Sequence, residues 1–198
     1  MTTTMDFYFD FVSPTAYLAF KRINQIKKDY DLKVNGFPVL LGGLIKASNN
    51  VSPITVPAKL AYSMGYDLPR YAKLYNVDMN PNPYFPINTL PLVRGALAAK
   101  ELGIFDEFCT VIFDAIWVEK LNMGDPTIIL QRLAEAGIDG EKLIALTQEP
   151  QIKQALIENT ESACKRGAFG VPTMFINNDM FFGQDRLFFI EKMLKNVS

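Results

Sequence analysis

Hydrophobic residues at the start of the chain alternate and then change to helical spacing. Residues 7–11 form an aromatic run that stops at Ser13 and Pro14, and apolar positions at helical spacing follow over residues 17–26. Aromatic residues suit a buried strand, so this stretch predicts a strand, a sharp stop and a helix. Ser13 is the predicted N-cap and Pro14 the first helical residue. A group that meets Ser13 therefore faces the positive end of a helix.

The next segment predicts one more strand and then a long helical block. Residues 32–41 have the pattern of a second strand after a helix, which completes a βαβ unit. Residues 44–57 are mostly polar and predict a loop. Residues 58–146 show apolar helical spacing broken by glycines and prolines, with little strand pattern. We therefore expect an all-helical insertion after the second strand.

The last third returns to a mixed pattern. Residues 150–166 predict a helix that stops at Gly167, and residues 169–176 predict a strand behind a Val-Pro step. A turn at 177–179 and a short strand at 180–182 complete a hairpin, and a closing amphipathic helix follows. The predicted order is βαβ, helical block, αββα. This order indicates an α/β protein with one domain from 1–55 and 150–198 and a helical domain at 56–149.

Composition excludes several classes of protein. The 198-residue chain has a formal net charge of −1, and its lysines and arginines are scattered, so we expect no nucleic-acid partner. No apolar run reaches the roughly 18 to 20 residues that cross a bilayer, so we expect no membrane partner either. The first residues lack the features of a signal peptide, which makes the cytoplasm the expected location.

Two features of the composition limit the chemistry. The chain has no histidine, which excludes a Ser-His-Asp triad, a Cys-His pair and any zinc site that uses imidazole. Its two cysteines, Cys109 and Cys164, are too far apart for a CxxC motif or a four-cysteine metal site. The chemistry must therefore use hydroxyls, carboxylates, amines or a borrowed group, and we expect no metal.

Four motifs in this order resemble one family. They are Asp6-Phe7-Tyr8-Phe9-Asp10-Phe11-Val12-Ser13-Pro14, Lys46-Ala47-Ser48-Asn49-Asn50, Phe169-Gly170-Val171-Pro172-Thr173 and Phe182-Gly183-Gln184-Asp185-Arg186. The chain is similar to the DsbA-like thioredoxin-fold family that contains kappa-class glutathione transferases and 2-hydroxychromene-2-carboxylate isomerases. The resemblance implies a thioredoxin fold interrupted by a helical domain. Family members are commonly dimers, which makes a homodimer an option by analogy.

The resemblance also implies a cofactor. Ser13-Pro14-Thr15-Ala16 stands where thioredoxin-like oxidoreductases have CxxC, so disulfide exchange by that motif is chemically impossible. The thiol must then be imported, and the family implies glutathione. Ser13 would be the catalytic residue that donates a hydrogen bond to the glutathione sulfur. The alternative is that Ser13 is only a helix cap.

Further glutathione contacts follow from the resemblance. Val171 and Pro172 match the cis-proline step whose backbone pairs with the cysteinyl part, and Gln184 with Asp185 match the binders of the γ-glutamyl group. Arg186 would hold this turn through a carboxylate. The alternatives are a simple strand-start proline, a helix cap by Asp185 and a solvated Arg186.

Asn50 and Lys46 match an asparagine and a lysine near glutathione, and a solvated loop is the alternative for both. The second substrate is expected between the domains. Its candidate residues are Tyr62, Tyr84, Phe85, Asn88, Arg94 and Trp117. Aromatic residues at helical spacing belong more often to the hydrophobic core than to a binding pocket. The chain departs from the isomerases at Ile45, where they have a lysine, and near Thr55-Val56, where they have an Asn-Arg pair. These departures put recognition of a chromene carboxylate in doubt.

We therefore predict a glutathione-dependent isomerase that resembles 2-hydroxychromene-2-carboxylate isomerase and acts on a small aromatic or conjugated substrate. The alternatives are a kappa-class glutathione transferase and a non-catalytic binding protein on a redox-inactive thioredoxin scaffold.

Overall fold

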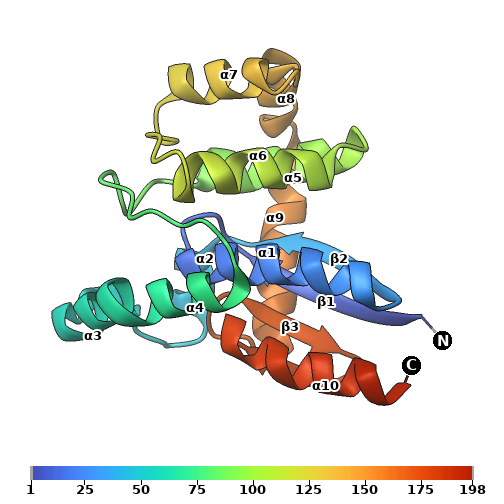
Figure 1. The fold of residues 1–198 in the computed structure, drawn as a ribbon. Coiled ribbons are helices and arrows are strands. Elements are labelled where there is room, and N and C mark those ends of the chain that lie inside the picture. Colours follow the sequence, from blue (N-terminus) through green and yellow to red (C-terminus); the bar gives the residue numbers. More distant parts are fainter. Residues whose placement is uncertain (1, 198) are drawn as a thin grey trace.

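A four-stranded sheet forms the centre of the computed structural model, which describes residues 2–197 (Figure 1). Its strands are β1 (Thr3–Phe9), β2 (Leu32–Pro38), β3 (Thr173–Ile176) and β4 (Asp179–Phe182). The strand order is β2-β1-β3-β4, with β2 parallel to β1 and both β3 and β4 antiparallel to their neighbours. Segments from the two ends of the chain thus pair directly. The predicted βαβ unit, the C-terminal hairpin and the α/β fold class are confirmed.

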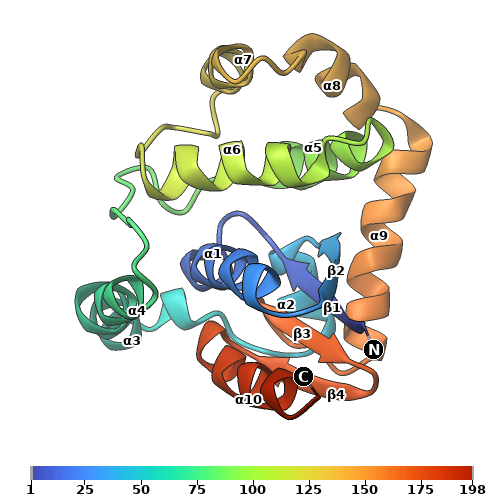
Figure 2. The ribbon, with the colours of Figure 1, turned by 45° about the vertical axis from the view of Figure 1, so that its right-hand side comes forward.

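Ten α-helices complete the fold of the described residues. They are α1 (Pro14–Asp29), α2 (Leu41–Ala47), α3 (Pro57–Tyr62), α4 (Leu68–Tyr75), α5 (Leu90–Glu101), α6 (Phe105–Trp117), α7 (Pro126–Glu135), α8 (Gly140–Thr147), α9 (Pro150–Lys165) and α10 (Leu187–Val197). Figure 2 shows α5 and α6 next to α1 and β2, α7 and α8 farther from the sheet, and α3 with α4 beside α10. Helix α9 leads from the helical block to the sheet (Figure 2). No helix among residues 2–197 is long and apolar enough to span a bilayer.

The first strand is buried on both faces, which explains its nearly continuous hydrophobic sequence. Met5, Phe7 and Phe9 belong to the large core that α1 and the helical block share. Tyr8 points to the opposite face, where it packs in a smaller core with Leu44 of α2 and residues around α9. The period of two along β1 therefore connects two separate cores through one strand.

The predicted loop at 44–57 is partly wrong, because α2 already begins at Leu41 and includes two glycines. Glycine costs about 1 kcal/mol per residue in a helix, so the pattern alone argues against this helix. Tertiary contacts offset that cost. Leu44 is fully buried, and the backbone N–H of Leu41 donates to the carboxylate of Asp10 at 2.9 Å. The second strand also ends earlier than predicted, at Pro38.

Candidate functional site

The turn between β1 and α1 presents Ser13 at the start of a helix. The backbone N–H of Ser13 donates to the carbonyl oxygen of Asp10 at 3.1 Å, and the Ser13 Oγ accepts from the N–H of Ala16 at 3.1 Å. Pro14 is the first helical residue. The predicted N-cap geometry is confirmed, and the hydroxyl lies within the positive end of the α1 dipole.

A second hydroxyl accompanies Ser13. The Oγ1 of Thr15 lies 2.9 Å from the Oγ of Ser13, and either atom can donate. Ser13 Oγ also lies 3.4 Å from the carbonyl oxygen of Val171, which can only accept. Ser13 Oγ accepts from the N–H of Ala16. If the Thr15 hydroxyl also donates to Ser13 Oγ, the one hydroxyl proton of Ser13 can be donated to a third group. In this structure that third group is the carbonyl oxygen of Val171, and the 3.4 Å contact is a weak hydrogen bond.

The loop before β3 brings Val171 to Ser13. The Val171–Pro172 peptide bond is cis. The ladder between β1 and β3 begins at Thr173, so the backbone of Val171 lies outside the sheet pairing. The Nδ2 of Asn50 donates to the carbonyl oxygen of Phe169 at 2.9 Å and ties the segment after α2 to this loop. An extended peptide could therefore pair with Val171 as an added strand.

The turn after β4 forms the next side of the site. Gly183 has φ of +97°, and a Cβ there would lie 2.6 Å from an oxygen of Asp185, so this position suits glycine. Gln184 is buried, and its carbonyl oxygen accepts from the hydroxyl of Tyr75 at 2.8 Å. Asp185 and Arg186 form an ion pair with each other. Tyr75 thus connects α4 to this turn, and its pKa is raised mainly by burial, which keeps the donor protonated.

These three segments enclose a cavity of about 390 Å³. The size is in the usual range for small-molecule sites. Of the predicted site residues, it brings together Ser13, Asn50, Phe85, Val171, Gln184, Asp185 and Arg186. Pro172 directly follows Val171. The remaining lining is largely apolar and comes from the turn before α1 and its first residues, from α2, from residues 52–64, from the loop before β3 and from the end of β4.

Other predicted substrate residues do not line this cavity. Trp117 is fully buried, and its Nε1 donates to the carbonyl oxygen of Phe11 at 3.0 Å, so it supports the turn before Ser13 from behind. Arg94 lines a separate hollow between α2, α5 and α9. Four further predicted residues are exposed and do not line the cavity: Lys46, Tyr62, Tyr84 and Asn88.

Thr15 and Lys59 are among the lining residues that the sequence analysis missed. Thr15 follows the serine in the stretch that replaces CxxC, and it was read only as part of that missing motif. Lys59 of α3 lines the cavity, is exposed, and makes no ion pair with any of residues 2–197. Its position in the first turn of a helix after a proline was a sequence signal, but nothing in the pattern of α3 showed which side faces Ser13.

A carboxylate lies buried beneath the site. Asp10 is 1% exposed, and its Oδ1 accepts from the hydroxyl of Thr89 at 2.6 Å and from the N–H of Val12 at 3.2 Å. With the bond from Leu41, this side chain joins the Ser13 turn, α2 and the start of α5. Burial raises the pKa of the Asp10 carboxyl, and these hydrogen bonds oppose that effect.

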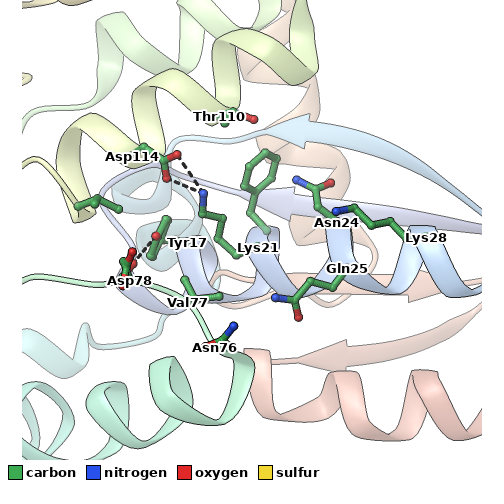
Figure 3. A pocket seen from close by; sticks show the side chains of 12 residues that line it. Tyr17, Lys21, Asn24, Gln25, Lys28, Asn76, Val77, Asp78, Thr110 and Asp114 are labelled. Carbon is green, nitrogen blue, oxygen red and sulfur yellow. Dashed lines mark hydrogen bonds and ion pairs between the residues drawn. The ribbon is translucent and has the colours of Figure 1, made fainter.

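A separate cavity of about 400 Å³ lies along α1, between the segment after α4 and helix α6 (Figure 3). Its lining is polar, and its groups already bond to one another. Lys21 pairs with Asp114 at 2.8 Å, and the hydroxyl of Tyr17 donates to the carbonyl oxygen of Asp78 at 2.5 Å. It contains none of the predicted site residues. Among the described residues no cluster of acids and cysteines could hold a metal ion.

Comparison with known proteins identifies the family of the chain. The family model of the DSBA-like thioredoxin domain matches residues 4–195. The chain belongs to this family. The thioredoxin fold that the four motifs implied is thereby confirmed.

Two kinds of enzyme are among the similar proteins. The chain is 30% identical over 194 residues to 2-hydroxychromene-2-carboxylate isomerase of Pseudomonas sp. strain C18, and the match covers 94% of this chain and 88% of that protein. It is 26% identical to glutathione S-transferase kappa 1 of Homo sapiens, covering 96% and 90%. A solved 2-hydroxychromene-2-carboxylate isomerase superposes with a TM-score of 0.88 at 28% identity, covering 98% and 95%. The predicted family resemblance is confirmed.

Proposed function

We propose that this protein is a glutathione-dependent isomerase for a small conjugated substrate. The observation that carries the proposal is the position of Ser13, whose hydroxyl lies at the start of α1 and next to the backbone of Val171, outside the sheet pairing, in one cavity. The similarity to isomerases over nearly the whole chain supports the reaction type.

The cavity offers a suitable partner for each polar part of glutathione. The backbone of Val171 suits the cysteinyl peptide, and Asp185 suits the α-ammonium of the γ-glutamyl group. Lys59, which makes no ion pair within residues 2–197, suits the glycyl carboxylate, and Asn50 lines the same cavity. The remaining Nδ2 proton of Asn50 is available, because the other is used on Phe169.

When bound, glutathione supplies a thiolate that adds to a conjugated carbon, converts a double bond to a freely rotating single bond, and leaves unchanged after rotation. Ser13 donates its proton as a hydrogen bond to the sulfur and thereby favours the thiolate over the thiol. Thr15 donates to Ser13 and strengthens that bond. The α1 N-terminus adds positive potential at the same point.

Calorimetric titration with glutathione and a turnover assay together test this proposal. We expect glutathione to bind, and its concentration to stay constant while the ultraviolet spectrum of a conjugated substrate changes. Net loss of glutathione would identify the transferase instead, which the kappa-class relatives favour. No binding at millimolar glutathione would contradict both enzymatic functions and favour the non-catalytic binding protein.

A further inference from the structure

We infer that the substrate-binding half of the cavity accepts an electrically neutral conjugated compound and discriminates against one that carries a carboxylate near the reacting carbon. This inference rests on the proposed function and concerns the part of the cavity that glutathione leaves free. It is carried by the charges and the apolar side chains of the lining.

The charged groups of the cavity number three. Lys59 and Arg186 are cations, and Asp185 is an anion that is already paired with Arg186. Glutathione with a blocked sulfur carries two carboxylates and one ammonium. The net positive charge of the cavity therefore equals the net negative charge of bound glutathione, and no cation is left for a further anion.

The rest of the lining offers no replacement for a cation. Six residues form what we call the apolar wall: Val12, Ile45, Ile54, Leu60, Met64 and Phe85. Ile45 of α2 is half-buried, and Lys46, the next residue, lies outside the cavity lining. A carboxylate placed against the apolar wall would lose hydration without gaining a charged partner.

The thiolate increases this discrimination. With the sulfur ionised, bound glutathione carries one more negative charge than the charged side chains of the cavity balance, and the α1 N-terminus offsets only part of it. A second anion beside the sulfur is then repelled, whereas an uncharged aromatic or conjugated group gains contact with Phe85 and the aliphatic residues.

Binding of unreactive glutathione conjugates tests the inference without turnover. The probes are S-(4-carboxybenzyl)glutathione and S-(4-carbamoylbenzyl)glutathione, which have nearly the same size and differ in charge. Calorimetry on the wild-type protein should give at least about tenfold tighter binding of the carbamoyl compound. Equal affinity, or tighter binding of the carboxylate, would overturn the inference.

Variants of the apolar wall make the test specific. Ile45→Lys should remove most of the difference between the two probes, and Ile45→Gln, which adds polarity without charge, should retain it. If Ile45→Lys fails to fold, the more exposed Ile54 allows the same pair, Ile54→Lys and Ile54→Gln. S-methylglutathione separates the two proposals: if it does not bind, the proposed function has failed, whereas binding of S-methylglutathione without charge discrimination contradicts this inference alone.

Discussion

The hydroxyl oxygen of Ser13 lies 3.4 Å from the carbonyl oxygen of Val171, which is 158 positions later in the sequence. The contact joins the first helix of the chain to the loop before β3. It exists because β1 and β3 are neighbours in the sheet, with Tyr8 opposite Thr173. The pairing of β1 with β3 thus brings the N-terminus of α1 next to the backbone of Val171, which lies outside the sheet pairing.

Replacement of Ser13 by alanine should weaken ionisation of bound glutathione. A hydrogen bond to a charged group contributes about 1.5 to 3 kcal/mol, so Ser13→Ala should raise the thiol pKa of bound glutathione by about 1 to 2 and lower turnover at neutral pH about 10- to 100-fold. Thiolate absorbance as a function of pH measures the first effect directly.

The loss of the helix cap needs its own control, since it costs about 0.5 to 2 kcal/mol of stability. Asp139 caps α8 through the N–H of Lys142 and is not among the residues that line the cavity. Asp139→Ala should therefore lower stability similarly and leave the thiol pKa unchanged. Unaltered turnover in Ser13→Ala would exclude the proposed role of this hydroxyl.

Thr15 should act on the sulfur through Ser13. Thr15→Val keeps the shape of the side chain and removes the donor 2.9 Å from Ser13 Oγ. A bond between neutral groups contributes about 0.5 to 1.5 kcal/mol, so the thiol pKa of bound glutathione should rise by up to about 1. Thr15→Ser retains the hydroxyl and should behave like the wild type. A thiol pKa that is the same in the valine and serine variants would show that Thr15 only fills space.

The sequence predicted the parts of the site that depend on local pattern. The Ser13-Pro14 cap is marked by two residue types that favour a helix start, whereas the Val171-Pro172 step and the turn at Gly183 were expected from the family motifs. The residues that face the cavity from the helical block were harder to predict. Helical spacing made Trp117 and Phe85 equally plausible, and only the packing of α6 against the Ser13 turn shows that Trp117 is buried behind it. Lys59 was missed because the orientation of α3 depends on long-range contacts.

Lys59 should contribute to glutathione affinity through the glycyl carboxylate. Lys59→Met keeps the aliphatic length and removes an exposed charge, so it should weaken glutathione binding about two- to fivefold. The glycyl ethyl ester of glutathione lacks that carboxylate, and its affinity should be the same for wild type and variant. Lys73→Met, on an exposed position of α4 outside the cavity lining, is the matched control. An equal loss for glutathione and its ester would assign Lys59 to another part of the ligand.

Asp10 should make stability depend on pH in a defined direction. Because burial raises the pKa of its carboxyl in the folded protein, the folded chain binds this proton more readily than the unfolded chain. The resulting stability is fully present below the ordinary aspartate range, at about pH 4, and is lost as pH rises through the raised pKa. Asp10→Asn removes this dependence.

The same substitution has a cost at every pH. An amide nitrogen next to the N–H of Leu41 cannot accept its hydrogen bond, so Asp10→Asn should lower the free energy of unfolding by about 1 to 3 kcal/mol. The difference between wild type and variant should therefore be largest near pH 4 and shrink as pH rises. Urea unfolding between about pH 4 and 8 measures it, with the exposed Asp29→Asn as control. A difference that grows with pH would mean that the hydrogen bonds from Thr89, Leu41 and Val12 outweigh burial, and that the folded protein holds Asp10 as a carboxylate.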